Sequence, residues 1–184
     1  MWKNYNRFYT QTLKSEAGYF YLCKNINQIP SVKKVSLTCV PGNPNNVKSV
    51  IMALSALQLI LNKKAKLVTS RDSVVLTKVR KGQPLGAKTF LTNGVVWQFI
   101  NFLTFNIMPR LDLTRLLHYN KKSLDFKFFI KSPAVFNRLI PFFKFFQFLP
   151  PIQVVFTLKK SSDIDKIFFW RLLKLPVSLL KKGS

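Results

Sequence analysis

The sequence predicts an α+β protein in which an antiparallel-rich mixed sheet carries helices on one face and leaves the other face open. Three observations lead to this class. Short segments with two-residue apolar periodicity alternate along the chain with segments of helical periodicity. The strand segments are apolar on one side only, which is typical of antiparallel sheets with one solvated face. The chain has 184 residues, enough to bury a hydrophobic core.

The first core strand is predicted over residues 32–39, where apolar and polar side chains alternate. A turn containing Pro and Gly follows, and Asn45 or Asn46 is placed to cap the next helix, which ends near Asn62. The apolar side chains expected to share one face of this helix are Val47, Val50, Ile51, Leu54, Leu57 and Leu61.

The middle of the chain predicts a basic hairpin and a second helix. A short strand ends at Thr69, a positively charged loop spans residues 71–82, and a second strand over 85–91 leads to the Asn93-Gly94 turn. The helix after this turn is predicted over residues 95–108, before a proline.

The last third predicts two further strands and a terminal helix. Alternating patterns place strands over residues 124–130 and 152–158, on either side of a Phe-rich segment. Ser162 followed by Asp165 resembles a capping box for a helix over 163–174. We expect one domain over residues 1–184, and its parts are a helical N-terminal segment (1–28), an α+β core (29–176) with a basic hairpin (67–92), and a basic tail (177–184).

The charge of the chain points to a polyanionic partner. Lys and Arg number 30 against 6 Asp and Glu, which gives a formal net charge of +24 at pH 7. Such an excess opposes compaction unless phosphates neutralise it, so nucleic acid and anionic membrane are the two candidate partners. Because 48% of the residues are hydrophobic, the chain is expected to fold and not to be disordered.

Membrane insertion is not expected. The apolar stretch over residues 139–156 contains Pro141, Lys144, Pro150 and Pro151, which would leave backbone groups unpaired in lipid. A basic membrane-associated protein stays a minority alternative, prompted by the same stretch.

Catalysis and cofactor binding are not expected either. His118 is the only histidine and has no partner at a meaningful spacing. Asp163 and Asp165 lie in a predicted first helical turn, where acids favour the helix dipole. The two cysteines, Cys23 and Cys39, form neither a zinc motif nor a disulfide framework, so a reducing compartment is the default.

Basic residues gather on and beside the predicted hairpin. They are accompanied by one acid, Asp72, and together predict a phosphate-binding stripe. The members are Lys63, Lys64, Lys66, Arg71, Lys78, Arg80, Lys81 and Lys88. Phe90 lies near Lys88 and suits stacking on unpaired bases, although core packing is the more usual role of Phe. The open sheet face is predicted to carry Lys34, Ser36, Thr38, Lys127, Lys131, Gln153 and Thr157.

Six segments, in order along the chain, resemble one protein family. They are 29–37 (IPSVKKVSL), 67–73 (LVTSRDS), 78–88 (KVRKGQPLGAK), 97–99 (WQF), 108–110 (MPR) and 152–157 (IQVVFT). Together they resemble the universal large-subunit ribosomal protein five. The loop tip Val75-Leu76-Thr77 and the Phe-rich segment 126–148 depart from the family pattern, so contacts made there do not transfer.

This resemblance implies an RNA-binding structural subunit with no catalytic activity. It implies binding of 5S rRNA and large-subunit rRNA through the open sheet face, in the central protuberance, with neighbouring ribosomal proteins, a small-subunit bridge protein and peptidyl-site tRNA as further partners. The RNA-binding residues expected from charge and resemblance together are Lys34, Thr38, Lys63, Lys64, Arg71, Lys78, Arg80, Lys88 and Phe90. The loop that would face tRNA contains Ser73, Val75, Leu76, Thr77 and Lys81.

The compartment expected is the mitochondrial matrix. The resemblance begins near Arg7, which leaves no room for a cleaved presequence, and the Phe, Lys and Asn bias suggests organellar encoding. The alternative within nucleic-acid binding is a general single-strand RNA-binding protein or chaperone, because a basic loop with nearby aromatics also fits that function.

Overall fold

The computed structural model describes residues 11–12, 14–21, 31–42, 46–73, 78–92, 94–111, 118–119, 125–158, 169–170, 173 and 175. These residues fall into two compact units. Unit 1 comprises 1–35, 91–128 and 155–184, and unit 2 comprises 36–90 and 129–154. The boundaries between the units fall at 35/36, 90/91, 128/129 and 154/155. The single-domain organisation stays a prediction.

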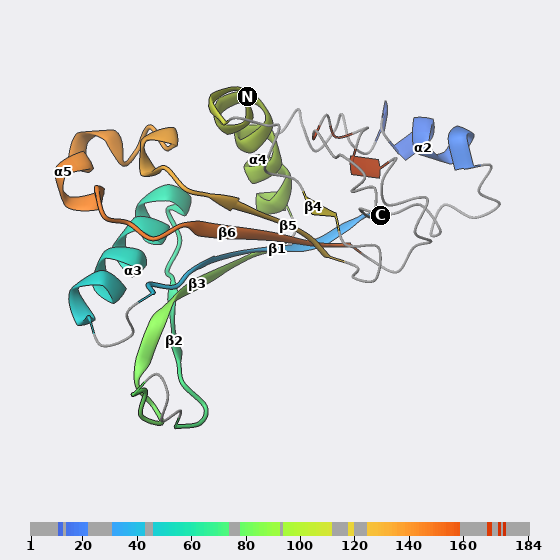
Figure 1. Cartoon of the computed structure of the whole chain (residues 1–184). Coiled ribbons are helices and arrows are strands. Elements are labelled where there is room, and N and C mark those ends of the chain that lie inside the picture. Colours follow the sequence, from blue (N-terminus) through green and yellow to red (C-terminus); the bar gives the residue numbers. More distant parts are fainter. Residues whose placement is uncertain are drawn as a thin grey trace, which may run out of the picture. The chain divides into compact units, whose positions relative to one another are not determined.

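The strands form a six-stranded sheet in the order β2-β3-β1-β6-β5-β4 (Figure 1). Their bounds are β1 Val32–Cys39, β2 Lys66–Thr69, β3 Pro84–Thr92, β4 His118–Tyr119, β5 Asp125–Ile130 and β6 Ile152–Leu158. The pairs β2/β3 and β4/β5 are antiparallel. The α+β class with an antiparallel-rich sheet is confirmed.

Alternation decides which side of each strand is buried, as the sequence predicted. On β6, buried Ile152, Val154, Phe156 and Leu158 alternate with half-buried residues. Other strands depart from strict alternation: Gly86 and Ala87 of β3 are both buried, and Ser36 of β1, expected on the open face, is only 7% exposed. β1 lies between β3 and β6 in the sheet, so Ser36 has a neighbouring strand on each side.

Helix α3 (Val47–Leu61) ends at Asn62, whose left-handed backbone (φ 51°) closes the last turn. Asn46 occupies the N-cap position but its side chain makes no cap hydrogen bond, and its carbonyl accepts from the Ser49 hydroxyl at 2.6 Å. The predicted apolar face was wrong in part, because Val47 and Ile51 are 59% and 57% exposed. The buried side chains are Val50, Ala53, Ala56, Leu57 and Ile60.

Unit 2 also contains the part of the Phe-rich segment that follows β5, for which no secondary structure was predicted. It folds as two 3-10 turns, η6 (Pro133–Val135) and η7 (Ile140–Phe142), and a short helix, α5 (Phe143–Phe146). Arg138 ties this segment to α3, because its Nη1 donates to the carbonyls of Leu59 and Ile60, each at 3.3 Å. In Figure 1, α3 and α5 lie near each other at the left, and the β2–β3 hairpin extends to the bottom of the view.

Unit 1 contains the second predicted helix, which changes type along its length. It begins as α4 (Gly94–Phe102), continues as a π-helical stretch (Leu103–Ile107) and ends as a 3-10 turn (Met108–Arg110). A proline in this last turn is tolerated because it occupies one of the first positions. The predicted helix is therefore confirmed, and it ends at Arg110 instead of at residue 108.

Aromatic side chains build the core of unit 1. The Phe126 ring lies 5.0 Å from the Trp170 ring and 6.0 Å from the Phe156 ring, and Phe99 of α4 lies 6.5 Å from Phe156. These centroid distances are those of favourable aromatic pairs. A short N-terminal helix, α2 (Lys14–Tyr21), falls within the predicted helical segment. The predicted terminal helix over 163–174 lies largely outside the described residues, apart from a helical turn at Phe169 and Trp170.

Candidate nucleic-acid interface

The basic loop of unit 2 is a hairpin end closed by backbone hydrogen bonds. The Ser70 N–H donates to the Gln83 carbonyl at 2.9 Å, and the Gly82 N–H donates to the Ser70 carbonyl at 3.1 Å. The Arg80 N–H donates to Oε1 of Gln83 at 3.0 Å. Gly82 has φ 81°, a conformation that glycine adopts without strain. These bonds hold the base of the loop in place, so its charges have defined positions.

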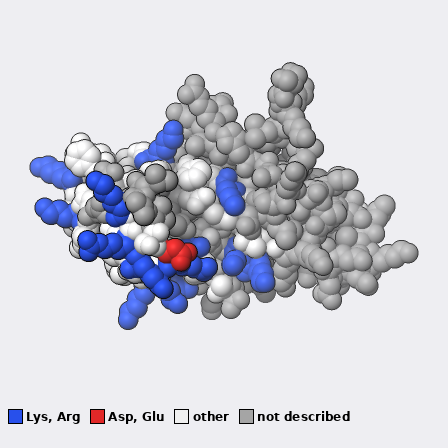
Figure 2. Space-filling model, turned by 60° about the horizontal axis from the view of Figure 1, so that its bottom comes forward, with Lys and Arg blue, Asp and Glu red and all other residues white. Residues whose placement is uncertain are grey.

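Positive charge dominates the surface of this hairpin. The exposed basic residues are Lys64, Lys66, Arg71, Lys78, Arg80 and Lys81, and within residues 36–90 and 129–154 the sequence contains one acid, Asp72. Figure 2 shows Lys and Arg side chains crowded at one end of the described surface, around a single acidic residue. Because one carboxylate cannot neutralise six cations, the surface of the hairpin keeps a strongly positive electrostatic potential.

Three lysines meet where the hairpin joins the sheet. Lys66 and Lys88 are direct cross-strand partners in the β2/β3 register. Like charges placed opposite each other in this way destabilise a sheet unless an anion lies between them. Lys88 Nζ lies 4.9 Å from the ring centroid of Phe90, and Lys63 Nζ donates to the Phe90 carbonyl at 2.9 Å. This arrangement is suited to a phosphate group, which would relieve the repulsion.

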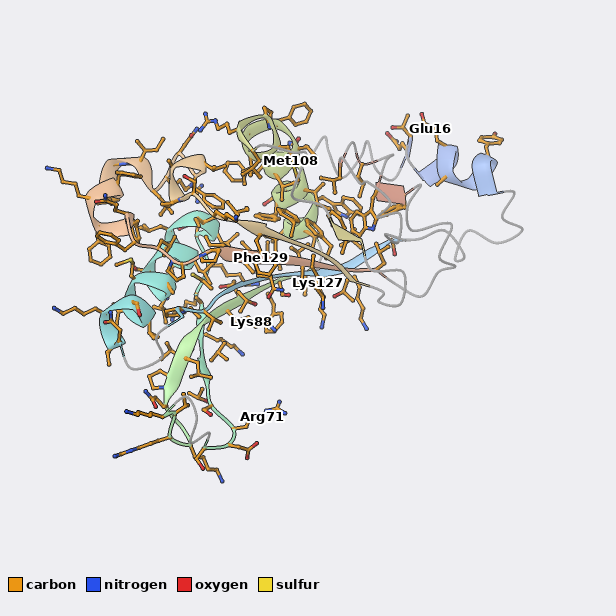
Figure 3. All side chains as sticks on the ribbon, viewed as in Figure 1. Glu16, Arg71, Lys88, Met108, Lys127 and Phe129 are labelled. Carbon is orange, nitrogen blue, oxygen red and sulfur yellow. The ribbon has the colours of Figure 1, made fainter. Side chains whose placement is uncertain are left out.

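The open face of the sheet carries polar side chains in each unit. In unit 2 it presents half-buried Thr38 and Gln153 and exposed Phe129, all out of phase with the buried side chains. In unit 1 it presents exposed Lys34 and Lys127 and half-buried Thr157. Figure 3 labels Lys88, Lys127 and Phe129 on their strands. In unit 2 this face combines hydrogen-bonding groups with an aromatic ring, and in unit 1 it carries two cations and a hydroxyl group.

The structure describes most of the residues that the sequence proposed for RNA. Lys63, Lys64, Arg71, Lys78, Arg80, Lys88 and Phe90 all belong to unit 2, on or beside the hairpin, and Thr38 lies on its sheet face. Lys34 lies on the unit 1 part of β1. Of the loop proposed to face tRNA, Ser73 and Lys81 are exposed on the two sides of the hairpin, and Val75, Leu76 and Thr77 lie outside the described residues.

Lys66 was predicted as a member of the phosphate-binding stripe but was not among the predicted RNA-binding residues, and Phe129 was in neither group. The strand register places Lys66 directly opposite Lys88. A local sequence pattern does not reveal this pairing. Phe129 was grouped with the other phenylalanines of the Phe-rich segment. Its position between Phe128 and Ile130 was the available signal, because strand alternation puts it on the opposite side from these buried neighbours.

The described residues hold no group of three or more His, Cys, Asp or Glu that could bind a metal ion. The buried Cys39 thiol donates to the Pro150 carbonyl at 3.5 Å, and burial raises the pKa of this thiol from 9.0 to about 12. A thiol with so high a pKa is a poor nucleophile at neutral pH. None of the described helices has the length and apolar character needed to cross a bilayer.

Three known proteins that share one name are similar in sequence to this chain. No protein-family model matches the sequence. The large ribosomal subunit protein uL5 of Malacoplasma penetrans is 24% identical over 189 residues, an alignment that covers 100% of this chain and 97% of that protein. The chain is therefore similar to uL5 along its whole length.

Two further uL5 relatives align over part of their length. The protein of Lawsonia intracellularis is 29% identical over 105 residues, which are 56% of this chain and 59% of the relative. The protein of Buchnera aphidicola is 27% identical over 121 residues, 65% of this chain and 66% of the relative. In both alignments this chain spans less than two thirds of the relative. The full-length alignment, by contrast, includes the hairpin and every strand of the sheet.

Proposed function

We propose that this chain is an RNA-binding structural constituent of the large subunit of a mitochondrial ribosome. Its uL5 relatives carry the name of a large-subunit ribosomal protein, which supports a structural role without catalysis. The cross-strand pair Lys66 and Lys88 at the root of an almost acid-free hairpin is the observation on which the proposal depends. Phosphates of folded RNA neutralise two such neighbouring ammonium groups.

Within the ribosome, 5S rRNA is the partner proposed for the open sheet face and the hairpin root. The hairpin end then extends toward peptidyl-site tRNA and a small-subunit bridge protein, and the rest of the chain contacts large-subunit rRNA and neighbouring proteins in the central protuberance. The separation of the basic hairpin end from the sheet face supports this division, because the two can engage different RNA elements at the same time.

The experiment is a binding titration of the whole chain with 5S rRNA and with an unrelated structured RNA of equal length, at matched salt. We expect at least tenfold tighter binding of 5S rRNA, and a log–log salt slope that becomes shallower by about one for each phosphate-contacting lysine replaced by Gln. Lys66→Gln and Lys88→Gln are the test variants, and Lys144→Gln, in the exposed part of α5, is the matched control.

Comparable affinity for both RNAs would favour the alternative, a general single-strand RNA-binding protein or chaperone. The ribosomal assignment and its compartment are tested by fractionating mitochondria of the source organism. We expect the chain to sediment with large ribosomal subunits. Recovery of the chain mainly outside ribosomal particles would overturn the proposal.

A further inference from the structure

Five large apolar side chains of unit 2 gather outside the core at the end of the Phe-rich segment, on η7, on α5 and just after it. Their exposed fractions run from 43% to 81%. We call them the Phe patch: Ile140, Phe142, Phe143, Phe145 and Phe148. Other side chains of the same segment fill its buried side, namely Phe136, Leu139, Phe146 and Leu149, each at most 7% exposed. The segment therefore contributes a separate set of side chains to the core and leaves the patch at the surface.

Local contacts hold the backbone that carries the patch. The Leu149 N–H donates to the Phe146 carbonyl at 3.0 Å, and the rings of Phe145 and Phe146 meet edge to face with their centroids 5.0 Å apart. Arg138 joins the segment to α3 through the two hydrogen bonds described above. Rings on an ordered backbone present a fixed surface, which lowers the entropy cost of binding a partner.

The patch is large enough for a protein interface. At roughly 150–250 Å² for each Phe, the exposed fractions amount to about 400–650 Å² of apolar surface. The largest apolar patch on a typical monomer covers about 300–600 Å² and is often functional. One partner in a standard interface contributes about 800 Å², of which about 57% is apolar. The Phe patch therefore matches the apolar part of one standard protein–protein interface.

The charges beside the patch indicate what its partner carries. Arg138 and Lys144 are exposed within the same segment, and neither residues 129–154 nor α3 contain an Asp or Glu. Interface rims are polar, and opposite charges meet across them. The partner surface therefore needs carboxylates around an apolar centre. A second copy of this chain does not meet this requirement, because it would bring the same cations together.

RNA fits the Phe patch less well than protein does. Interfaces with nucleic acid are more polar and much more positively charged than interfaces between proteins. Residues 138–148 contain two cations beside the five apolar side chains, whereas the hairpin surface has six cations and one acid. The Phe-rich segment also departs from the pattern of the family that the chain resembles, so its partner is inferred from this chain alone.

We propose that the Phe patch is a docking surface for a neighbouring protein whose contact surface is apolar at its centre and carries Asp or Glu at its rim. This inference rests on the proposed function and deepens it, because it assigns a surface to one neighbouring protein and names the chemistry of that neighbour. The patch is covered in the ribosomal particle and exposed in the free chain. RNA binding by the hairpin and the open sheet face does not depend on it.

Carbodiimide crosslinking of purified large ribosomal subunits tests the proposal, because this reagent joins an amine to a carboxylate only where the two are in contact. We expect Lys144 to form an amide with an Asp or Glu of another protein, in a segment that also carries large apolar side chains. Hydroxyl-radical footprinting gives a second measurement. In the particle, oxidation of the patch rings should fall to the level of buried Phe146, and in the free chain it should exceed that level.

Two variants of the whole chain then measure how much the patch contributes to affinity for the crosslinked protein. Phe145→Asp places a carboxylate in the apolar centre, and Phe148→Ser removes a ring that is 81% exposed. Each is expected to weaken binding at least about tenfold and to leave binding of 5S rRNA unchanged. Val47→Asp is the matched control, since it changes a 59% exposed side chain at the opposite end of α3 from the Arg138 contact. We expect it to leave both affinities unchanged.

The outcomes separate this inference from the function on which it rests. If the patch rings are as reactive in the particle as in the free chain, or if Lys144 couples to no other protein, the docking surface is wrong and the ribosomal assignment stands. It is also wrong if both patch variants bind the crosslinked protein as the wild-type chain does. Binding of the free chain to phosphatidylcholine and phosphatidylglycerol vesicles that Phe148→Ser abolishes would make the patch a lipid surface instead. Absence of the chain from the purified particles would overturn the proposed function itself.

Discussion

At the scale of single residues, Gly86 shows how closely two strands of unit 2 approach. A Cβ atom at this position would lie 2.5 Å from the Cys39 carbonyl oxygen and 3.0 Å from Val40 Cα, both backbone atoms that do not move aside easily. We therefore expect Gly86→Ala to lower the free energy of unfolding by about 1–3 kcal/mol. Urea denaturation followed by circular dichroism measures this loss.

Two other glycines of unit 2 serve as controls for that measurement. A Cβ added at Gly42 meets nothing within 4 Å, so Gly42→Ala is expected to leave stability almost unchanged. Gly82 also has open space but adopts φ 81°, so Gly82→Ala costs about 1–2 kcal/mol from backbone strain alone. If Gly86→Ala were as stable as Gly42→Ala, the close approach of β3 to the Cys39 carbonyl would be wrong.

Cys39 gives a prediction about pH at the same scale. Because burial raises the pKa of this thiol from 9.0 to about 12, the folded chain keeps the proton in a range where the unfolded chain releases it. The resulting stabilisation is intact below pH 9 and is lost as the pH rises from 9 toward 12. Relative to Cys39→Ala, the wild-type chain should lose about 1 kcal/mol of stability between pH 8 and pH 10.

Thiol labelling provides an independent check in a Cys23→Ser background. At pH 8 the Cys39 thiol should react with a disulfide reagent only after denaturant is added, since it is buried and protonated. Rapid labelling of the native chain would contradict the buried position of this side chain.

At the scale of elements, Arg138 links the Phe-rich segment to α3. The last turn of α3 contains no basic residue, and the guanidinium donates to the carbonyls of Leu59 and Ile60, at the end where the helix dipole is negative. We expect Arg138→Ala to lower the free energy of unfolding by about 1 kcal/mol, because two partly solvated hydrogen bonds and a favourable charge are lost. Thermal denaturation measures the change. Lys144→Ala removes the same charge from exposed α5 and should have no comparable effect.

Strands were predictable from the sequence because their periodicity is local. Residues 32–39 and 152–158 alternate between apolar and polar or between large and small side chains, and β1 and β6 have these bounds. The buried face of α3 was harder to predict, because hydrophobicity favoured Val47 and Ile51 over two alanines. Ala53 and Ala56 are buried since small side chains allow close packing, which a hydrophobicity pattern does not record.

Elements held together by distant partners were not predictable. Strand β4 has two residues, His118 and Tyr119, and exists through its pairing with Lys127 and Phe126 of β5. The same limit applies to the candidate interface. The sequence identified the basic hairpin by composition, but the opposition of Lys66 to Lys88 depends on strand register, and the exposure of Phe129 depends on which face of β5 is covered.

At the scale of the whole molecule, four strands pass from one unit into the other. Each of these strands, β1, β3, β5 and β6, contributes residues to both units. Neither unit therefore contains any of the four strands in full. We therefore expect a single cooperative unfolding transition, in agreement with the one-domain expectation. Differential scanning calorimetry should give equal calorimetric and van't Hoff enthalpies. Two resolved transitions would show that the units unfold separately.

β2, at one edge of the sheet, affects how readily the free chain associates with other copies of itself. It is four residues long, begins with Lys66 and has an irregular register between Val68 and Thr69. If β2 of a second copy paired with this edge, the Lys64 and Lys66 ammonium groups of both molecules would come together. This edge of the sheet therefore resists pairing with another copy of the same phenylalanine-rich polypeptide.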